Sequence, residues 1–250
     1  MVAVVLRLGG RGTLFLMDSR LIVALDLPAA APALALADRL HGHVRQLKVG
    51  MELYYAEGPA LVRELRSRGF SVFLDLKLHD IPNTVAAAVR SAAATGAELL
   101  TIHAAGGPAM LRAAADAAAG LPNPPQLLAV TVLTSMDAAQ MAAIGIDAVP
   151  ADQVQRLAAV AAGSGITGFV ASAEEVALLH GLYPQATLVI PGIRPAGAAT
   201  GDQKRVATPA AALAGGASFL VIGRPITQAP DPVAATEAIL AEMASVPMRS

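Results

Sequence analysis

The feature that most constrains the fold of this chain is a repeated alternation of short apolar segments with Ala- and Leu-rich segments. Each apolar segment is rich in Leu, Val and Ile, and a turn and a stretch of helical periodicity follow it. We predict eight strands, over residues 21–26, 45–50, 71–77, 98–103, 126–133, 167–172, 187–191 and 218–223. We predict helices that follow these strands, near residues 29–41, 57–69, 82–95, 107–119, 151–163, 172–181, 207–215 and 232–245.

Eight consecutive βα units favour a single α/β domain, a closed (β/α)8 or TIM barrel. The length of 250 residues is typical of one such barrel. An open doubly wound sheet is the alternative, but no G-x-G-x-x-G motif follows the first predicted strand. We also expect a small extra helix near residues 137–144. The Gly-, Ala- and Pro-rich loop at 192–203 is predicted to be mobile.

The first residues differ in pattern from the rest of the chain. Residues 1–19 contain short apolar runs interrupted by Arg7 and by GGRG, without the continuous apolar core and cleavage site of a signal peptide. Met17 stands just before the first predicted strand. We assign residues 1–19 to an N-terminal extension, either mobile or upstream of the true start, and residues 20–250 to the barrel.

Composition excludes several classes of protein. A content of 55% hydrophobic and 15% charged residues is incompatible with a disordered chain. The net charge of −1 and the 3% aromatic content argue against a nucleic-acid partner. The absence of cysteine excludes disulfides, thiolate metal sites and a Cys nucleophile. No apolar stretch reaches the length of a transmembrane helix, so we expect a cytoplasmic protein without a membrane partner.

Charged residues gather where the predicted strands end, which in a barrel is the face that carries function. Asp75 and Lys77 lie two positions apart on the third strand, so both side chains point to the same side. With Lys48 from the second strand they can form a network of alternating charge. An isolated D-x-K would be better explained as a structural ion pair, but Lys48 and a nearby phosphate-type site favour a functional role.

The phosphate-type site is predicted after the last two strands. Gly223 and Arg224 end the eighth strand, where barrels often bind phosphate. Glycine allows close backbone approach, and arginine supplies a bidentate cation. Arg194, after the seventh strand, is a candidate second cation, and Gln203 on the following loop could close over the anion.

Several motifs in a fixed order make the prediction more specific. They are LIVALD, LKVG, DLKLHDIPNT, TIHAAGG, VTVLTS, IPGIR, GDQKRV and FLVIGRPI, between about residues 20 and 230. In these motifs the chain resembles the orotidine 5′-phosphate decarboxylase family, and DLKLHDIPNT is the most diagnostic of them. The resemblance implies decarboxylation of orotidine 5′-phosphate to UMP and CO2, the last step of UMP biosynthesis, without metal or other cofactor.

The resemblance also implies the site residues. The catalytic set it implies is Lys48, Asp75, Lys77 and Asp80. The implied substrate-binding set is Asp26, Lys48, Ile81, Thr84, Thr134, Ser135, Pro191, Arg194, Gln203, Gly223 and Arg224. By the same resemblance, Asp80, Ile81 and Thr84 reach into the site of the neighbouring subunit, so the active form would be a homodimer.

The implied mechanism rests on Lys77, which would stabilise a carbanion-like transition state at C6 of the pyrimidine and then protonate that carbon. Asp75 would lie near the departing carboxylate. Either it destabilises the ground state or it holds Lys77 charged and oriented. We interpret His103 as a hydrogen-bonded core histidine rather than a catalytic one.

Two alternatives remain at this point. Metal-dependent relatives, such as 3-keto-gulonate-6-phosphate decarboxylase and hexulose-phosphate synthase, share the D-x-K-x-x-D element but not IPNT, PGIR or GDQKR. A noncatalytic barrel that binds a phosphorylated ligand is the second alternative, since a fold does not establish activity. Such a binder would not need Lys77 beside two aspartates.

Overall fold

The predicted closed barrel is confirmed. The computed structural model describes residues 4–8, 14–195 and 207–246. Eight parallel strands close in the order β10-β3-β4-β5-β6-β7-β8-β9. They are β3 (Leu21–Ala24), β4 (Gln46–Gly50), β5 (Ser71–Leu78), β6 (Leu99–His103), β7 (Gln126–Val130), β8 (Gly168–Val170), β9 (Thr187–Ile190) and β10 (Phe219–Ile222). Each coincides with a strand predicted from the sequence.

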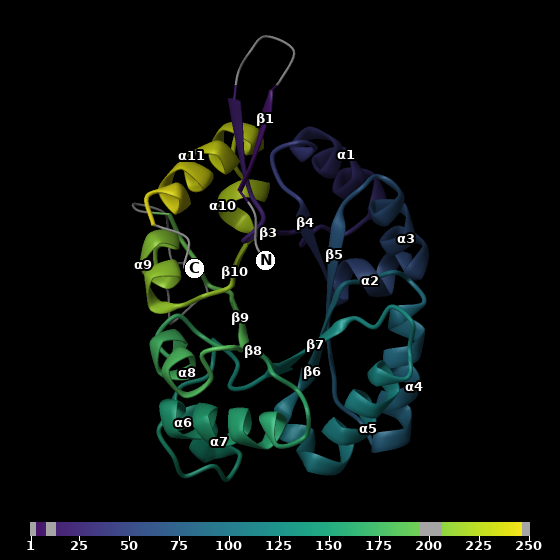
Figure 1. The fold of residues 1–250 in the computed structure, drawn as a ribbon, viewed down its shortest axis with the longest axis vertical. Coiled ribbons are helices and arrows are strands. Elements are labelled where there is room, and N and C mark those ends of the chain that lie inside the picture. The colour runs from purple at the N-terminus through teal and green to yellow at the C-terminus, as the bar shows by residue number, and fades with distance from the viewer. Residues whose placement is uncertain (1–3, 9–13, 196–206, 247–250) are drawn as a thin grey trace.

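Helices surround the strands on the outside (Figure 1). Those that follow the predicted pattern are α1 (Ala30–Leu40), α3 (Pro59–Ser67), α4 (Pro82–Ala93), α5 (Gly107–Ala119), α7 (Pro150–Ala162), α8 (Val176–Leu182), α9 (Pro209–Gly215) and α11 (Pro232–Ala244). Several begin with proline at the first turn, where its missing N–H has no helical partner to lose. The expected extra helix is α6 (Ala138–Ala143). No helix within the described ranges is long and apolar enough to cross a membrane.

Some boundaries differ from the sequence-based expectation. Three short elements were not predicted: α2 (Met51–Glu57), the 3₁₀ helix η1 (Ala104–Gly106) and α10 (Arg224–Thr227). Strand β7 ends at Val130 instead of continuing to 133, so residues 131–133 already belong to the loop. Helix α8 begins at Val176 and not at 172, because the Glu175 carboxylate accepts from the Ser172 backbone and holds that segment as a turn. The loop predicted to be mobile, 192–203, lies mostly outside the described residues.

Strand alternation divides apolar side chains between two cores. One set faces out toward the helices, and the other fills the barrel interior. The inner set consists of Ile22, Ala24, Phe73, Leu99, Leu128, Val189 and Val221, with Val170 and Phe219 packed against them. Side chains on a strand alternate with a period of two, so every second residue points inward. The inward residue nearest the C-terminal end of each strand therefore lies at the mouth of the barrel.

An N-terminal hairpin lies outside the barrel. Strands β1 (Val4–Leu8) and β2 (Leu14–Asp18) pair antiparallel, with Val4 opposite Asp18. Figure 1 shows the hairpin projecting from the barrel, and β2 lies beside α11. The sequence predicted no strand in residues 1–19, and the division of the chain at residue 20 stays a prediction.

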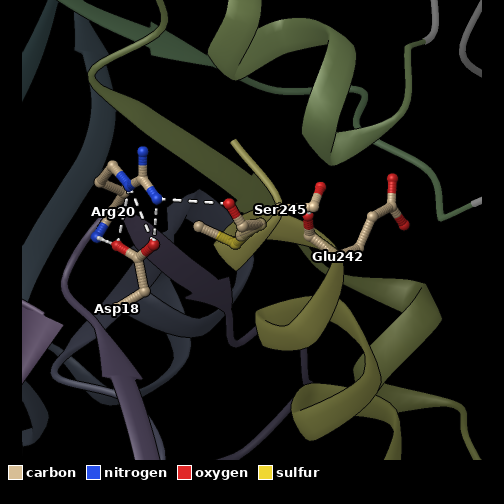
Figure 2. A network of polar contacts seen from close by, with 5 residues as sticks. Asp18, Arg20, Glu242 and Ser245 are labelled. Carbon is tan, nitrogen blue, oxygen red and sulfur yellow. Dashed lines mark hydrogen bonds and ion pairs between the residues drawn. The ribbon is translucent and has the colours of Figure 1, made fainter. Parts of the chain in front are cut away.

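A buried ion pair joins this hairpin to the N-terminal end of the barrel. Arg20 donates to both carboxylate oxygens of Asp18, with Nη2 2.5 Å from Oδ2 and Nε 2.9 Å from Oδ1. Figure 2 shows the guanidinium turned toward this carboxylate beside the end of α11, and its Nη2 lies 3.5 Å from the Met243 carbonyl oxygen. Both residues are less than a tenth exposed. The pair therefore ties β2, β3 and α11 together.

Candidate active site

Four charged side chains form a continuous row at the C-terminal ends of β3, β4 and β5. Lys48 Nζ lies 2.8 Å from Asp26 Oδ1 and 3.6 Å from Asp75 Oδ2. Lys77 Nζ lies 2.8 Å from Asp75 Oδ1. The signs alternate along the row, as expected from the D-x-K spacing. The strand register brings these side chains together. Lys48 on β4 pairs with Ala24 on β3, and Gly50 on β4 pairs with Asp75 on β5.

Asp75 is the most enclosed carboxylate of the row, with a side chain 14% exposed. Burial alone would raise its pKa, because removing water disfavours the charged form. The ammonium groups of Lys48 and Lys77 oppose that effect, as do hydrogen bonds from Lys77 and Thr101, and the net result is a lowered pKa. Asp75 is therefore held as a carboxylate between two cations.

The backbone at Lys77 is unusual. Strands β5 and β6 pair regularly at Leu74–Leu100, but their next pair is Leu78–Ile102, so β5 holds two extra residues in a bulge. Within the bulge Lys77 has a φ of +51°, a left-handed conformation that a non-glycine residue rarely adopts and that costs about 1–3 kcal/mol. Strain of this kind gathers at functional sites. Here it directs the Lys77 side chain toward Asp75.

Thr101 on β6 holds this bulge from the opposite strand. Its Oγ1 accepts from the Lys77 backbone N–H at 2.8 Å and donates to Asp75 Oδ1 at 3.0 Å. Its side chain is fully buried. The sequence analysis did not select Thr101, although the alternation of β6 places it on the inward face, between Leu99 and His103.

The row opens onto a cavity of about 230 Å³ at the mouth of the barrel. Its charged and polar lining residues are Asp26, Lys48, Asp75, Lys77, Thr134, Arg194 and Arg224, with Pro191, Gly192 and Gly223. Arg194 follows β9, which lies opposite β5 in the closed barrel, and Arg224 follows the adjacent β10. The cavity thus has the Asp75–Lys77 pair on one side and two guanidinium groups on the other.

Glycines make room for this row. A Cβ on Gly50 would lie 3.0 Å from Lys48 Nζ and 3.3 Å from Asp26 Oδ1, so any side chain there would press on the ion pair. A Cβ on Gly223 would meet Asp26 Oδ2 and the Ala24 Cβ at 3.4 Å. Gly223 was predicted from the sequence and Gly50 was not. Gly50 could have been found from its inward position, two residues after Lys48 on the same strand.

Part of the predicted site lies away from this cavity. Ser135 is exposed and is not among the described residues that line the cavity. Asp80, Ile81 and Thr84 are exposed on the β5–α4 connection and the first turn of α4, and Ile81 is 67% exposed. The Asp80 carboxylate accepts from the Ile81 backbone at 2.6 Å. Gln203 lies outside the described residues.

His103 faces His79 rather than the cavity. The two rings lie 5.4 Å apart between centroids. Burial lowers the pKa of His103, and the neighbouring His79 and Lys77 lower it further. The ring is half-buried, and the structure gives it no hydrogen bond among the described residues. The interpretation of His103 as a hydrogen-bonded core histidine therefore stays a prediction.

The walls between the two charged sides are apolar. Residues of this wall are Phe73, Val130, Val132, Val170, Val189 and Val221. The sequence analysis named none of them, yet most are inward positions of their strands and could be found from alternation alone. They give the cavity apolar walls, and a surrounding of low polarity strengthens electrostatic interactions beside it.

The charged residues that line the cavity indicate what kind of ligand it could bind. Asp26 and Asp75, the carboxylates that face the cavity, are both engaged by lysines. No group of three or more His, Asp or Glu side chains arranged to hold a metal ion occurs in the part of the chain that the structure describes. Arg194 and Arg224 line the same cavity as Gly223, and arginine is a residue type suited to a phosphate.

Comparisons with known proteins identify the family of the chain. The family model described as "Orotidine 5'-phosphate decarboxylase / HUMPS family" matches residues 19–239. The orotidine 5′-phosphate decarboxylase of Halorhodospira halophila is 55% identical over 90% of this chain and 96% of its own length. That of Alkalilimnicola ehrlichii is 56% identical over 91% and 97%. The crystal structure of the Lactobacillus acidophilus enzyme has 40% identity and a TM-score of 0.80, covering 90% of this chain and 99% of that one.

Proposed function

The chain belongs to the orotidine 5′-phosphate decarboxylase / HUMPS family, and from this premise we propose that it converts orotidine 5′-phosphate to UMP and CO2, as a carboxy-lyase of pyrimidine biosynthesis. The observation that carries the proposal is the placement of the Asp75–Lys77 pair across one cavity from Arg194 and Arg224. A nucleotide has its phosphate and its reacting carbon at opposite ends, and this cavity offers a matching group for each.

The substrate would lie across the barrel mouth. Its phosphate would bind Arg194 and Arg224 beside Gly223, where a glycine backbone permits close approach. Its ribose hydroxyls would bind the Asp26–Lys48 pair. The pyrimidine would then lie near Thr134 and Pro191, beside the apolar walls, with its C6 carboxylate directed at Lys77.

Lys77 would do the chemical work at C6. Loss of CO2 breaks the bond from C6 to the carboxylate carbon and leaves an electron pair on C6, without a resonance sink. The Lys77 ammonium would stabilise that charge and then transfer a proton to C6, which gives UMP. Solvent returns the proton to the lysine amine.

Asp75 has two candidate roles, and its surroundings support one of them. It accepts from Lys77 Nζ, and its Oδ2 lies 3.6 Å from Lys48 Nζ. Its lowered pKa keeps it ionised. We propose that Asp75 mainly orients Lys77, while repulsion of the substrate carboxylate adds to the effect as CO2 leaves.

We further propose that the active form is a homodimer with shared sites. The argument is the position of Asp80, Ile81 and Thr84, which are exposed and away from the cavity of their own subunit. Ile81 is 67% exposed, and a second subunit placed over it would remove this apolar side chain from water. A cytoplasmic location, and the lack of a nucleic-acid or membrane partner, stay predictions from the sequence.

The shared site predicts complementation between two defective chains. Asp80→Asn would impair the neighbour's site, and Lys77→Ala would impair its own. In a hybrid dimer, one of the two sites contains neither change. With random assortment half of the dimers are hybrids and half of their sites are intact, so roughly a quarter of wild-type activity should return when both chains are coexpressed. Activity no higher than that of the two separate variants would contradict the shared site.

The first experiment is to follow the absorbance of orotidine 5′-phosphate after adding the purified protein, with and without EDTA. Conversion to UMP that resists EDTA is the expected outcome. Conversion that EDTA abolishes would contradict the cofactor-free mechanism and favour metal-dependent chemistry, as in the sugar-phosphate relatives. No conversion by a folded protein that still binds UMP would favour a noncatalytic binding role.

A further inference from the structure

We infer that Thr101 is a positioning residue, which sets the geometry and charge state of the Asp75–Lys77 pair without touching the substrate. This inference rests on the proposed function and adds a residue to it. Thr101 lies outside the set of described residues that line the cavity. Its fully buried hydroxyl nevertheless connects to both members of the pair.

Thr101 holds the backbone of Lys77. The β5 bulge removes Lys77 from the regular ladder with β6, so its N–H needs another acceptor. Thr101 Oγ1 supplies that acceptor at 2.8 Å. A left-handed non-glycine residue persists only where the surroundings hold it, and the threonine hydroxyl is the group that holds this one from β6.

Thr101 also holds the Asp75 carboxylate. The same hydroxyl donates its proton to Asp75 Oδ1 at 3.0 Å, and Lys77 Nζ donates to that same oxygen at 2.8 Å. The contacts form a closed ring that runs from the Lys77 N–H through Thr101 and Asp75 back to the Lys77 ammonium. One hydroxyl therefore orients both ends of the lysine, through its backbone and through its ion-pair partner.

Thr101 also affects the protonation of Asp75. The charged groups around Asp75 are Lys77 on its own strand and Lys48 on β4, with Asp26 beyond Lys48. The half-buried His103 on β6 is the further titratable group that acts on it. Thr101 adds a hydrogen bond that the carboxylate can accept and that favours its ionised form. Loss of the hydroxyl should shift the protonation of Asp75 toward higher pH.

The test compares Thr101→Val, which replaces the hydroxyl with a methyl group, with Thr101→Ser, which keeps the hydroxyl. Thr101→Val should lower kcat by about 100-fold, because a misplaced catalytic group is costly, and leave the affinity for UMP near that of wild type. The acid limb of its pH–rate profile should move to higher pH. Thr101→Ser should recover most of the kcat and the original acid limb.

Thr236→Val is a matched control for the loss of a buried hydroxyl. Thr236 is also fully buried and donates to the Pro232 carbonyl within α11, away from the cavity. It should lose stability in thermal unfolding but keep its kcat. An equal fall of kcat in Thr236→Val, or a Thr101→Ser variant as slow as Thr101→Val, would overturn the positioning role, because either result would assign the effect to packing.

A carbon NMR titration of the Asp75 carboxyl separates this inference from the proposed function. A wild type that does not decarboxylate orotidine 5′-phosphate would contradict the proposed function alone, and the titration would still measure the effect of Thr101 on Asp75. A pKa of Asp75 that is equal in wild type and Thr101→Val would overturn the inference. So would wild-type turnover in a folded Thr101→Val protein.

Discussion

Both ends of the barrel hold an aspartate paired with a cation, and the two groups differ in what else they contact. At the N-terminal end, Asp18 receives three side-chain hydrogen bonds from Arg20, and both residues are buried. At the C-terminal end, Asp75 is shared between Lys48 and Lys77, and the row opens onto a cavity. The first group is complete in itself, whereas the second has cationic charge directed at a space where a ligand fits.

The difference shows how to tell a structural ion pair from a functional one. A buried pair that satisfies itself makes weak net contributions but is costly to break. A carboxylate held between two lysines, on a strained strand at the mouth of a barrel, directs both of its partners toward the cavity. The chain therefore places similar residue types in a closed pair at one end and in a row that faces a cavity at the other.

The largest expected effect that tests this contrast is on turnover. Lys77→Ala should lower kcat by at least about 10⁴-fold, because it removes both the charge that stabilises the transition state and the proton donor. UMP binding should remain measurable, since the phosphate contacts are intact. The measurement is steady-state decarboxylation together with calorimetric UMP binding. A kcat within tenfold of wild type would show that the C-terminal row is structural as well.

The second largest effect is expected on the stability of the N-terminal end of the barrel. Arg20→Ala should lower the free energy of unfolding by about 3–5 kcal/mol, because it leaves the Asp18 carboxylate buried without a partner. Urea denaturation measures the loss, and the turnover of the folded protein should stay near that of wild type.

The control for Arg20→Ala is Arg39→Ala. Arg39 pairs with Asp231 at 3.3 Å, and both side chains are more than half exposed. Because water and salt screen such a pair, its loss should cost less than about 1 kcal/mol. If Arg20→Ala and Arg39→Ala cost the same, the pair at the N-terminal end does not hold the hairpin and α11 in place.

The smallest effect is the pH dependence of stability that Asp75 contributes. Its pKa in the folded state is lowered from 3.8, so the unfolded chain binds the proton more readily. The contribution is therefore fully present above the unfolded pKa and is lost as the pH falls through the folded pKa, with a slope of at most about 1.4 kcal/mol per pH unit. Asp75→Asn should flatten acid unfolding curves in that range. An unchanged slope would mean that Lys48 and Lys77 do not stabilise the carboxylate.

Much of this site could be predicted from the chain alone. The period-two alternation on β5 places Asp75 and Lys77 on one face, and a parallel barrel brings Lys48, Arg194 and Arg224 to the same mouth. Those inferences depend on local spacing and on the direction of strands, which the sequence carries directly. The motif DLKLHDIPNT then narrowed the chemistry to one family.

Other features depended on the tertiary structure. The left-handed backbone at Lys77 and its support by Thr101 arise from a shift of register between two strands, and a bulge leaves no clear mark in one strand's sequence. The hairpin of β1 and β2 is stabilised where Asp18 meets Arg20 and α11, a contact over more than two hundred residues of chain. The separation of Asp80 and Ile81 from their own cavity is likewise a matter of where the β5–α4 connection turns. Local pattern thus determined which residues face the mouth, and long-range packing decided how they are held there.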